Sequence, residues 1–225
     1  METQSVAPTP HLERLPPELI RTILINLSGL TSLRCAILSS RTLLSSFTAD
    51  PPAIAMRVLL NELDARHVRP EAMAALLASE LTKPTRSSAQ AFFKAHLQNR
   101  NVECGIRLTL DQITHFSRLH STVSRMAEDF ATATLQHLVT AIKDNHISQP
   151  QPQFLEPSAL ERHRIMRTLC ILEVFFSIFR QTTMPNTELG QSMNDFLLNF
   201  AHWEIEQIAC MQEFLFFQVS PSNMT

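Results

Sequence analysis

Apolar residues in the second half of the chain recur at the spacing of a buried helical face. From Ile113 to Phe130 they step by three or four positions, which predicts one long helix over about 109–145 with a single apolar stripe. Between 158 and 179, apolar residues instead occupy nearly the whole circumference, Phe176 and Phe179 included. That distribution is typical of a helix at the centre of a core.

Proline and capping residues mark where helices begin and end. Thr109 is followed three residues later by Gln and Ser158 by Glu, the pattern of a capping box. Helices are also predicted over about 17–27, 30–47 with a break near 39–40, 51–66, 70–81, 92–97, 187–199 and 202–218. Residues 82–90 read as a loop or linker. No segment alternates apolar and polar residues for long enough to form a strand, so the predicted fold class is all-α.

Composition supports a helical globular protein. The 225 residues are 44% hydrophobic and 18% charged, with three glycines and no tyrosine, which disfavours hairpins. A net charge of −2 leaves no electrostatic footprint for nucleic acid or an anionic membrane. The most apolar run, 169–179, is too short to span a bilayer and contains Glu173. The four cysteines include no CxxC pair, and residues 1–10 contain no apolar signal core. The sequence therefore predicts a cytoplasmic or nuclear protein.

Candidate catalytic and metal-binding patterns are weak. His115 and His120 are the nearest histidine pair, and five residues place them about 140° apart around a helix, too far to share a metal. There is no Gly-x-Ser-x-Gly elbow or phosphate-binding glycine loop. Buried apolar settings disfavour a reactive cysteine. The sequence therefore predicts no metal, no cofactor and no enzymatic activity.

Two polar features leave alternatives open. Four basic residues gather at 162–164 and 167 near Glu156 and Glu161, which favours a solvated face or internal ion pairs over a site for an acidic partner. Trp203 is the only tryptophan. We expect it to be a core anchor whose indole N–H finds an acceptor, rather than a platform for a ligand.

The run Leu-Pro-Pro-Glu-Leu-Ile-Arg-Thr-Ile-Leu-Ile-Asn-Leu at 15–27 resembles the opening of an F-box, with Leu-Pro, an acid two residues later and spaced apolar positions. The match continues without a gap through 30 and 33 to Leu-Ser-Ser-Arg at 38–41. In that family the segment is a three-helix module that docks on the Skp-type adaptor of SCF ubiquitin ligases. Thr42 stands where many members carry a tryptophan. The resemblance implies an adaptor-binding surface and its support, formed by Leu15, Pro16, Ile23, Leu24, Leu27, Leu33 and Leu38.

The rest of the chain is similar to F-box-like proteins of filamentous fungi, and this similarity rests on residues 160–162, 172–173, 179 and 203–210. The expected organisation is a flexible lead over 1–12, an F-box-like unit over 13–50 and a C-terminal domain over 51–225, a multi-helix bundle with long antiparallel helices. The expected function is a protein-interaction subunit that recruits an unidentified protein substrate to an SCF-type ligase. The alternatives are a helical scaffold that no longer meets the adaptor and a bundle that binds a small molecule. No leucine-rich, WD or kelch repeat is present to indicate the substrate.

Overall fold

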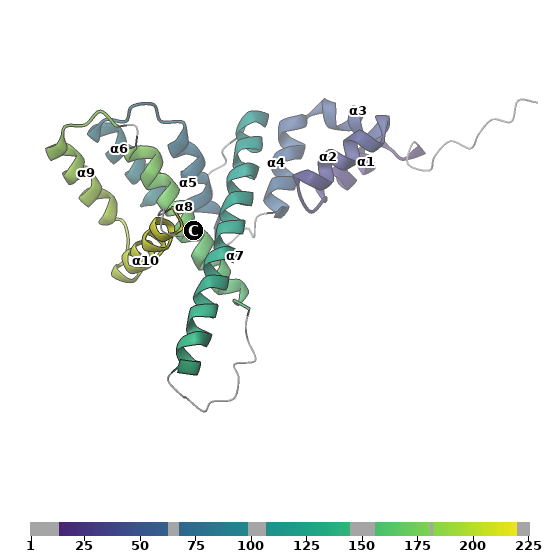
Figure 1. The fold of residues 1–225 in the computed structure, drawn as a ribbon. Helices are drawn as coiled ribbons and strands as arrows, with labels where there is room; N and C mark the ends of the chain where they lie inside the picture. Colours follow the sequence, from purple (N-terminus) through teal and green to yellow (C-terminus); the bar gives the residue numbers. More distant parts are fainter. Residues whose placement is uncertain (1–13, 63–67, 99–106, 145–155, 181, 220–225) are drawn as a thin grey trace, which may run out of the picture. The chain divides into compact units, whose positions relative to one another are not determined.

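Every element of secondary structure in the described part of the chain is helical, so the all-α fold class is confirmed (Figure 1). The computed structural model describes residues 14–62, 68–98, 107–144, 156–180 and 182–219. The predicted flexible lead, 1–12, and Cys104 lie outside these ranges. The helices form two compact units, one of residues 1–65 with 105–117 and one of residues 66–104 with 118–225.

Four helices build most of the first unit: α1 (Pro17–Ile25), α2 (Leu30–Ser39), α3 (Arg41–Ala49) and α4 (Pro51–Glu62). The predicted break is confirmed, because Ser40 separates α2 from α3 in an extended conformation with φ −147° and ψ 131°. The Asn61 side chain of α4 donates hydrogen bonds to the carbonyls of Ile25, at 2.7 Å, and Leu27, at 3.0 Å. It thereby satisfies acceptors that the end of α1 leaves open.

The first unit is larger than the predicted F-box-like unit of residues 13–50. α4 packs on α1, α2 and α3, and the start of α7 (Leu110–Asp144), as far as Ser117, groups with the same unit. Three short helices leave an apolar face uncovered, and a fourth helix is needed to close a core around it. α4 contributes four side chains to that core, each at most 3% exposed: Ile54, Ala55, Val58 and Leu59.

The second unit is organised around α8 (Ala159–Phe179), as predicted. α5 (Arg69–Ser79), α9 (Asn186–Leu197) and α10 (His202–Val219) pack on this helix. The predicted capping box is present: the Ser158 hydroxyl accepts from the Glu161 N–H at 3.2 Å, and Glu161 Oε2 accepts from the Ser158 N–H at 2.8 Å. Two orphan N–H groups at the start of α8 are therefore satisfied.

Phenylalanine rings fill the region where α8 and α9 meet η2 (Phe93–Leu97), a single π-helical turn that continues α6 (Arg86–Phe92). Phe196 is fully buried. Its ring centroid lies 5.5 Å from Phe93, 5.5 Å from Phe175 and 5.0 Å from Phe200. Each such pair contributes about 0.5–1.5 kcal/mol beyond the burial of its area, so this cluster anchors the C-terminal end of α8.

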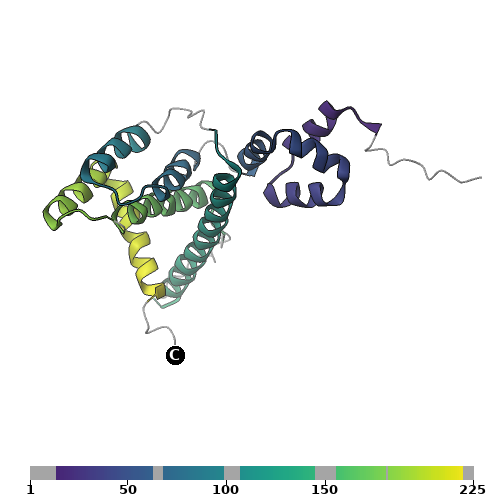
Figure 2. The same ribbon diagram turned by 90° about the horizontal axis from the view of Figure 1, so that it is seen from above.

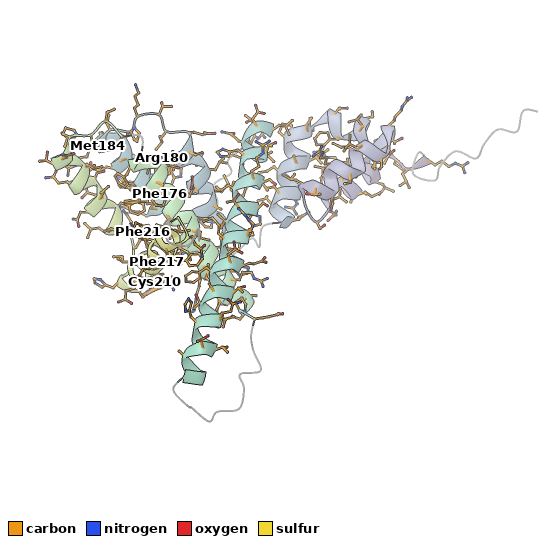
Figure 3. All side chains as sticks on the ribbon, viewed as in Figure 1. Phe176, Arg180, Met184, Cys210, Phe216 and Phe217 are labelled. Carbon is orange, nitrogen blue, oxygen red and sulfur yellow. The ribbon has the colours of Figure 1, made fainter. Side chains whose placement is uncertain are left out.

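The prediction that Phe176 lies in the core is wrong, because its side chain is 40% exposed. Glu173 precedes it by three residues and Arg180 follows by four, so all three share one stripe of the helix. Arg180 is exposed and Glu173 is half-buried. Phe176 and Arg180 are labelled in Figure 3. The polar neighbours on this stripe were the available sign that it faces solvent.

The predicted loop at 82–90 is also wrong in its second half, where α6 begins at Arg86. Thr85 and Ser88 cap that helix reciprocally, each side chain bonding the other residue's backbone N–H, at 3.3 Å and 2.9 Å. Serine can take the place of the glutamate or glutamine of a capping box here because the Ser88 hydroxyl lies only 2.9 Å from the Thr85 backbone nitrogen. A search restricted to Glu or Gln at the third helical position misses this start.

Candidate functional site

The seven residues predicted for adaptor binding divide between the core and the surface of the first unit. Leu24 and Leu33 are buried and hold the helices together. Leu15 and Leu27 are half-buried, whereas Pro16, Ile23 and Leu38 are exposed, the last two by 41% and 75%. The structure therefore separates a supporting pair from side chains that a partner can reach.

α1 carries two apolar stripes that differ in exposure. Ile20 and Leu24 are four residues apart and buried, whereas Leu19 and Ile23, each one position earlier, are exposed. Ile23 is consequently a surface residue of α1 and does not belong to the core of the first unit. Leu19 was missed as a surface residue, although its i, i+4 spacing with Ile23 places the two side by side. Leu44 of α3 is a further exposed leucine that the sequence did not single out.

A groove of about 680 Å³ runs between α1 and α3 in the first unit. Thr42 lines it, together with Glu18, Arg21 and Arg41. Arg21 also donates to Asp50 Oδ2 at 3.2 Å, an exposed pair that contributes little stability. The position where many F-boxes carry a tryptophan thus opens here onto a groove that a threonine side chain leaves unfilled.

A buried ion triad joins three helices of the second unit. Arg167 of α8 donates from Nε to Glu71 Oε1 of α5 at 2.7 Å and from Nη2 to Glu204 Oε1 of α10. The other oxygen of Glu204 accepts from the Ala201 N–H at 2.8 Å, which caps the start of α10. Both carboxylates are buried. Of the two readings left open for the basic cluster, internal ion pairing therefore holds for Arg167.

A pocket of about 640 Å³ lies within the second unit, lined by the part of α7 beyond residue 118, α8 and α10. Figure 2 views these helices from above, with α10 running toward α7. The rings of Phe130 in α7 and Phe214 in α10 meet edge to face at 5.1 Å and join the two helices. Trp203 lines the pocket and is 52% exposed. The expectation that Trp203 is a core anchor is wrong, because it lies in the first turn of α10, at the pocket's edge.

The described residues hold no metal-binding cluster, and the buried thiol of Cys170 is unreactive. Among them, no three His, Cys, Asp or Glu side chains lie close enough together to hold one ion. Burial, reinforced by the nearby charges of Glu71 and Glu173, raises the pKa of the Cys170 thiol well above its usual range. Cys170 thus lacks the thiolate that a nucleophile needs.

No helix in the described ranges is long and apolar enough to cross a bilayer.

The chain was compared with family models, with curated proteins and with solved structures, and none of the three comparisons gives a match.

Proposed function

We propose that the chain is a protein-interaction subunit that recruits a protein substrate to an SCF-type ubiquitin ligase and catalyses no reaction itself. Its first unit docks on a Skp-type adaptor, in line with the resemblance of residues 15–47 to F-boxes. The second unit holds the substrate. Such a subunit acts by proximity, since it raises the effective concentration of the bound target near a charged conjugating enzyme.

The observation that carries the proposal is the exposure of apolar side chains on helices whose core is already complete. Ile23 and Leu38 point away from a core that Leu24 and Leu33 fill. Exposed apolar groups on short helices supply the anchors that helix-mediated protein interfaces use. Burial of one such leucine in an interface contributes about 1.5–3 kcal/mol.

A matched pair of exposed leucines tests the docking surface. Leu38 of the first unit is 75% exposed, and Leu198 of the second unit is 76% exposed. Leu38→Ala should weaken binding of a recombinant Skp-type adaptor at least tenfold, about 1.4 kcal/mol. Leu198→Ala should leave the dissociation constant unchanged. Calorimetric titration measures both, and equal effects of the two variants would remove the leucine surface from the proposal.

The double variant Leu15→Ala, Pro16→Ala probes the same surface without disturbing the fold. Pro16 contributes only its carbonyl to α1, accepting from Leu19 N–H at 3.0 Å and Ile20 N–H at 3.2 Å. Alanine keeps that carbonyl, so the start of the helix is preserved. Adaptor binding should weaken at least tenfold, while circular dichroism and the melting temperature change little.

The open groove at Thr42 favours a second candidate, a helical scaffold whose F-box-like unit no longer meets the adaptor. Thr42→Trp separates the two. If the adaptor uses this surface, an indole filling the groove adds apolar contact area and should lower the dissociation constant. If the wild-type chain and Thr42→Trp both fail to bind the adaptor, the scaffold function takes the place of the ligase function.

A further inference from the structure

The pocket in the second unit combines an apolar interior with an acidic, open rim. Met211 and Ala131 lie buried in its wall, with half-buried Phe130 and Ile165 beside them. Its volume of about 640 Å³ falls in the range of ligand-binding sites, about 300–1,000 Å³. The residues at its edge are exposed, so an occupant can belong to a larger molecule that continues outside the pocket.

The rim carries three carboxylates, from Glu156, Glu161 and Glu206, against one guanidinium, from Arg164. Hydrogen bonds from the Ser158 hydroxyl and N–H hold the pKa of Glu161 below its usual value, so this carboxylate stays charged at neutral pH. Glu206 forms no hydrogen bond or ion pair with any residue in the described ranges. The excess of negative charge selects a cationic occupant.

Trp203 adds the second element of cation recognition. Glu206 follows it by three residues, so the indole and the carboxylate lie on one face of α10. A lysine or arginine head group above an indole face gains about 0.5–1 kcal/mol at an exposed site. The half-buried carboxamide of Gln207, also in the lining, can hydrogen-bond a backbone amide.

We infer that this pocket binds a short peptide segment of a partner protein, with a lysine or arginine side chain at Trp203 and Glu206 and a neighbouring apolar side chain against Phe130, Ile165 and Met211. As a description of the recruited substrate, the inference rests on the proposed function. As a peptide site it does not, because every lining residue belongs to the second unit.

The chain contains one tryptophan and no tyrosine, so its indole emission reports on this pocket alone. The 225-residue chain is titrated with the peptide acetyl-Ala-Leu-Arg-Phe-Ala-amide, and in parallel with peptides in which glutamate replaces the arginine or alanines replace the leucine and phenylalanine. The arginine peptide should change the emission saturably, and either altered peptide should bind at least fivefold more weakly. Equal responses to the arginine and glutamate peptides, or no response to any of them, would overturn the inference.

Two glutamates of α10 provide a matched control. Glu206→Gln should weaken binding of the arginine peptide about three- to fivefold, the scale of an exposed charge pair. Glu213→Gln, at an exposed position outside the pocket, should change it less than twofold. Cys210 is exposed and lines the pocket, so saturating peptide should also slow its alkylation by iodoacetamide. Equal weakening by the two variants, together with unprotected Cys210, would mean that the peptide binds elsewhere.

No adaptor is present in these titrations, so they can fail or succeed independently of the proposed ligase role. The Leu15→Ala, Pro16→Ala variant should bind the arginine peptide as the wild-type chain does. A loss of peptide binding in that variant would contradict a site confined to the second unit.

Discussion

Removal of the Arg167 cation should destabilise the second unit more than any change at its surface. Arg167→Met keeps a long apolar side chain in α8 but leaves Glu71 and Glu204 as two buried carboxylates without their shared partner. Breaking a buried ion pair from one side costs about 3–5 kcal/mol. The Arg167 side chain is 26% exposed, and water reaching the site places the expected loss near 3 kcal/mol, the lower end of that range.

The loss is measurable as a melting temperature. About 3 kcal/mol corresponds to a decrease of roughly 6–12 °C for a protein of this size. Arg162→Met is the matched control, since Arg162 lies five residues earlier in the same helix and is exposed. That variant should melt within about 2 °C of the wild type, as surface substitutions usually change stability by less than 0.5 kcal/mol.

Neutralising one of the two carboxylates that lose Arg167 should restore part of the stability lost in Arg167→Met. Glu71→Gln combined with Arg167→Met leaves one buried charge instead of two, so the double variant should melt above Arg167→Met alone. Equal melting temperatures for Arg167→Met and Arg162→Met would refute a triad that ties α5, α8 and α10 together.

Three further predictions follow from single side chains. Leu24→Ala should cost about 2–5 kcal/mol in denaturant unfolding, whereas Ile23→Ala, one residue away on the exposed stripe, should cost under about 1 kcal/mol; equal losses would contradict the two stripes of α1. Hydrogen bonds from Ser158 lower the pKa of Glu161 in the folded state, so the capping box stabilises α8 fully above the ordinary carboxyl pKa and this stabilisation is lost as the pH falls through the lowered pKa. The melting temperature of Ser158→Ala should therefore fall less than that of the wild type over this acid range. An equal fall for the two proteins would contradict the cap. Native iodoacetamide treatment followed by mass spectrometry should label Cys35 and Cys210 but spare buried Cys170, whose pKa is raised; labelling of Cys170 before unfolding would contradict its burial.

The helices could be predicted from sequence because their signals are local. The Ser158 capping box defines the start of α8, and Pro51 and Pro70 stand at or beside the first residues of α4 and α5. The break at Ser40 was marked by the serine pair, whose side chains compete with helical hydrogen bonding. Each of these signals acts within one helical turn, so no tertiary information was needed.

The features that could not be predicted from the sequence depend on contacts between distant segments. Glu71 and Arg167 are 96 residues apart in sequence, and no spacing rule connects them. Trp203 and Phe176 have apolar side chains, yet each is exposed because no other helix in the described ranges covers its position. The membership of α4 in the first unit likewise follows from packing, while the resemblance to F-boxes ended before it. Local patterns predict which residues form a helix, but the faces that become buried are decided by the helices around it.

Adaptor binding by the unmodified chain is the measurement on which the proposed function depends. Titration of the 225-residue chain with a recombinant Skp-type adaptor, followed by calorimetry, should show a one-to-one complex with a dissociation constant below about 10 µM, or roughly −7 kcal/mol. The complex should also slow hydrogen exchange of backbone amides in α1, α2 and α3. Absence of heat and of protection with adaptor at about 50 µM would contradict the ligase function and leave the chain as a scaffold.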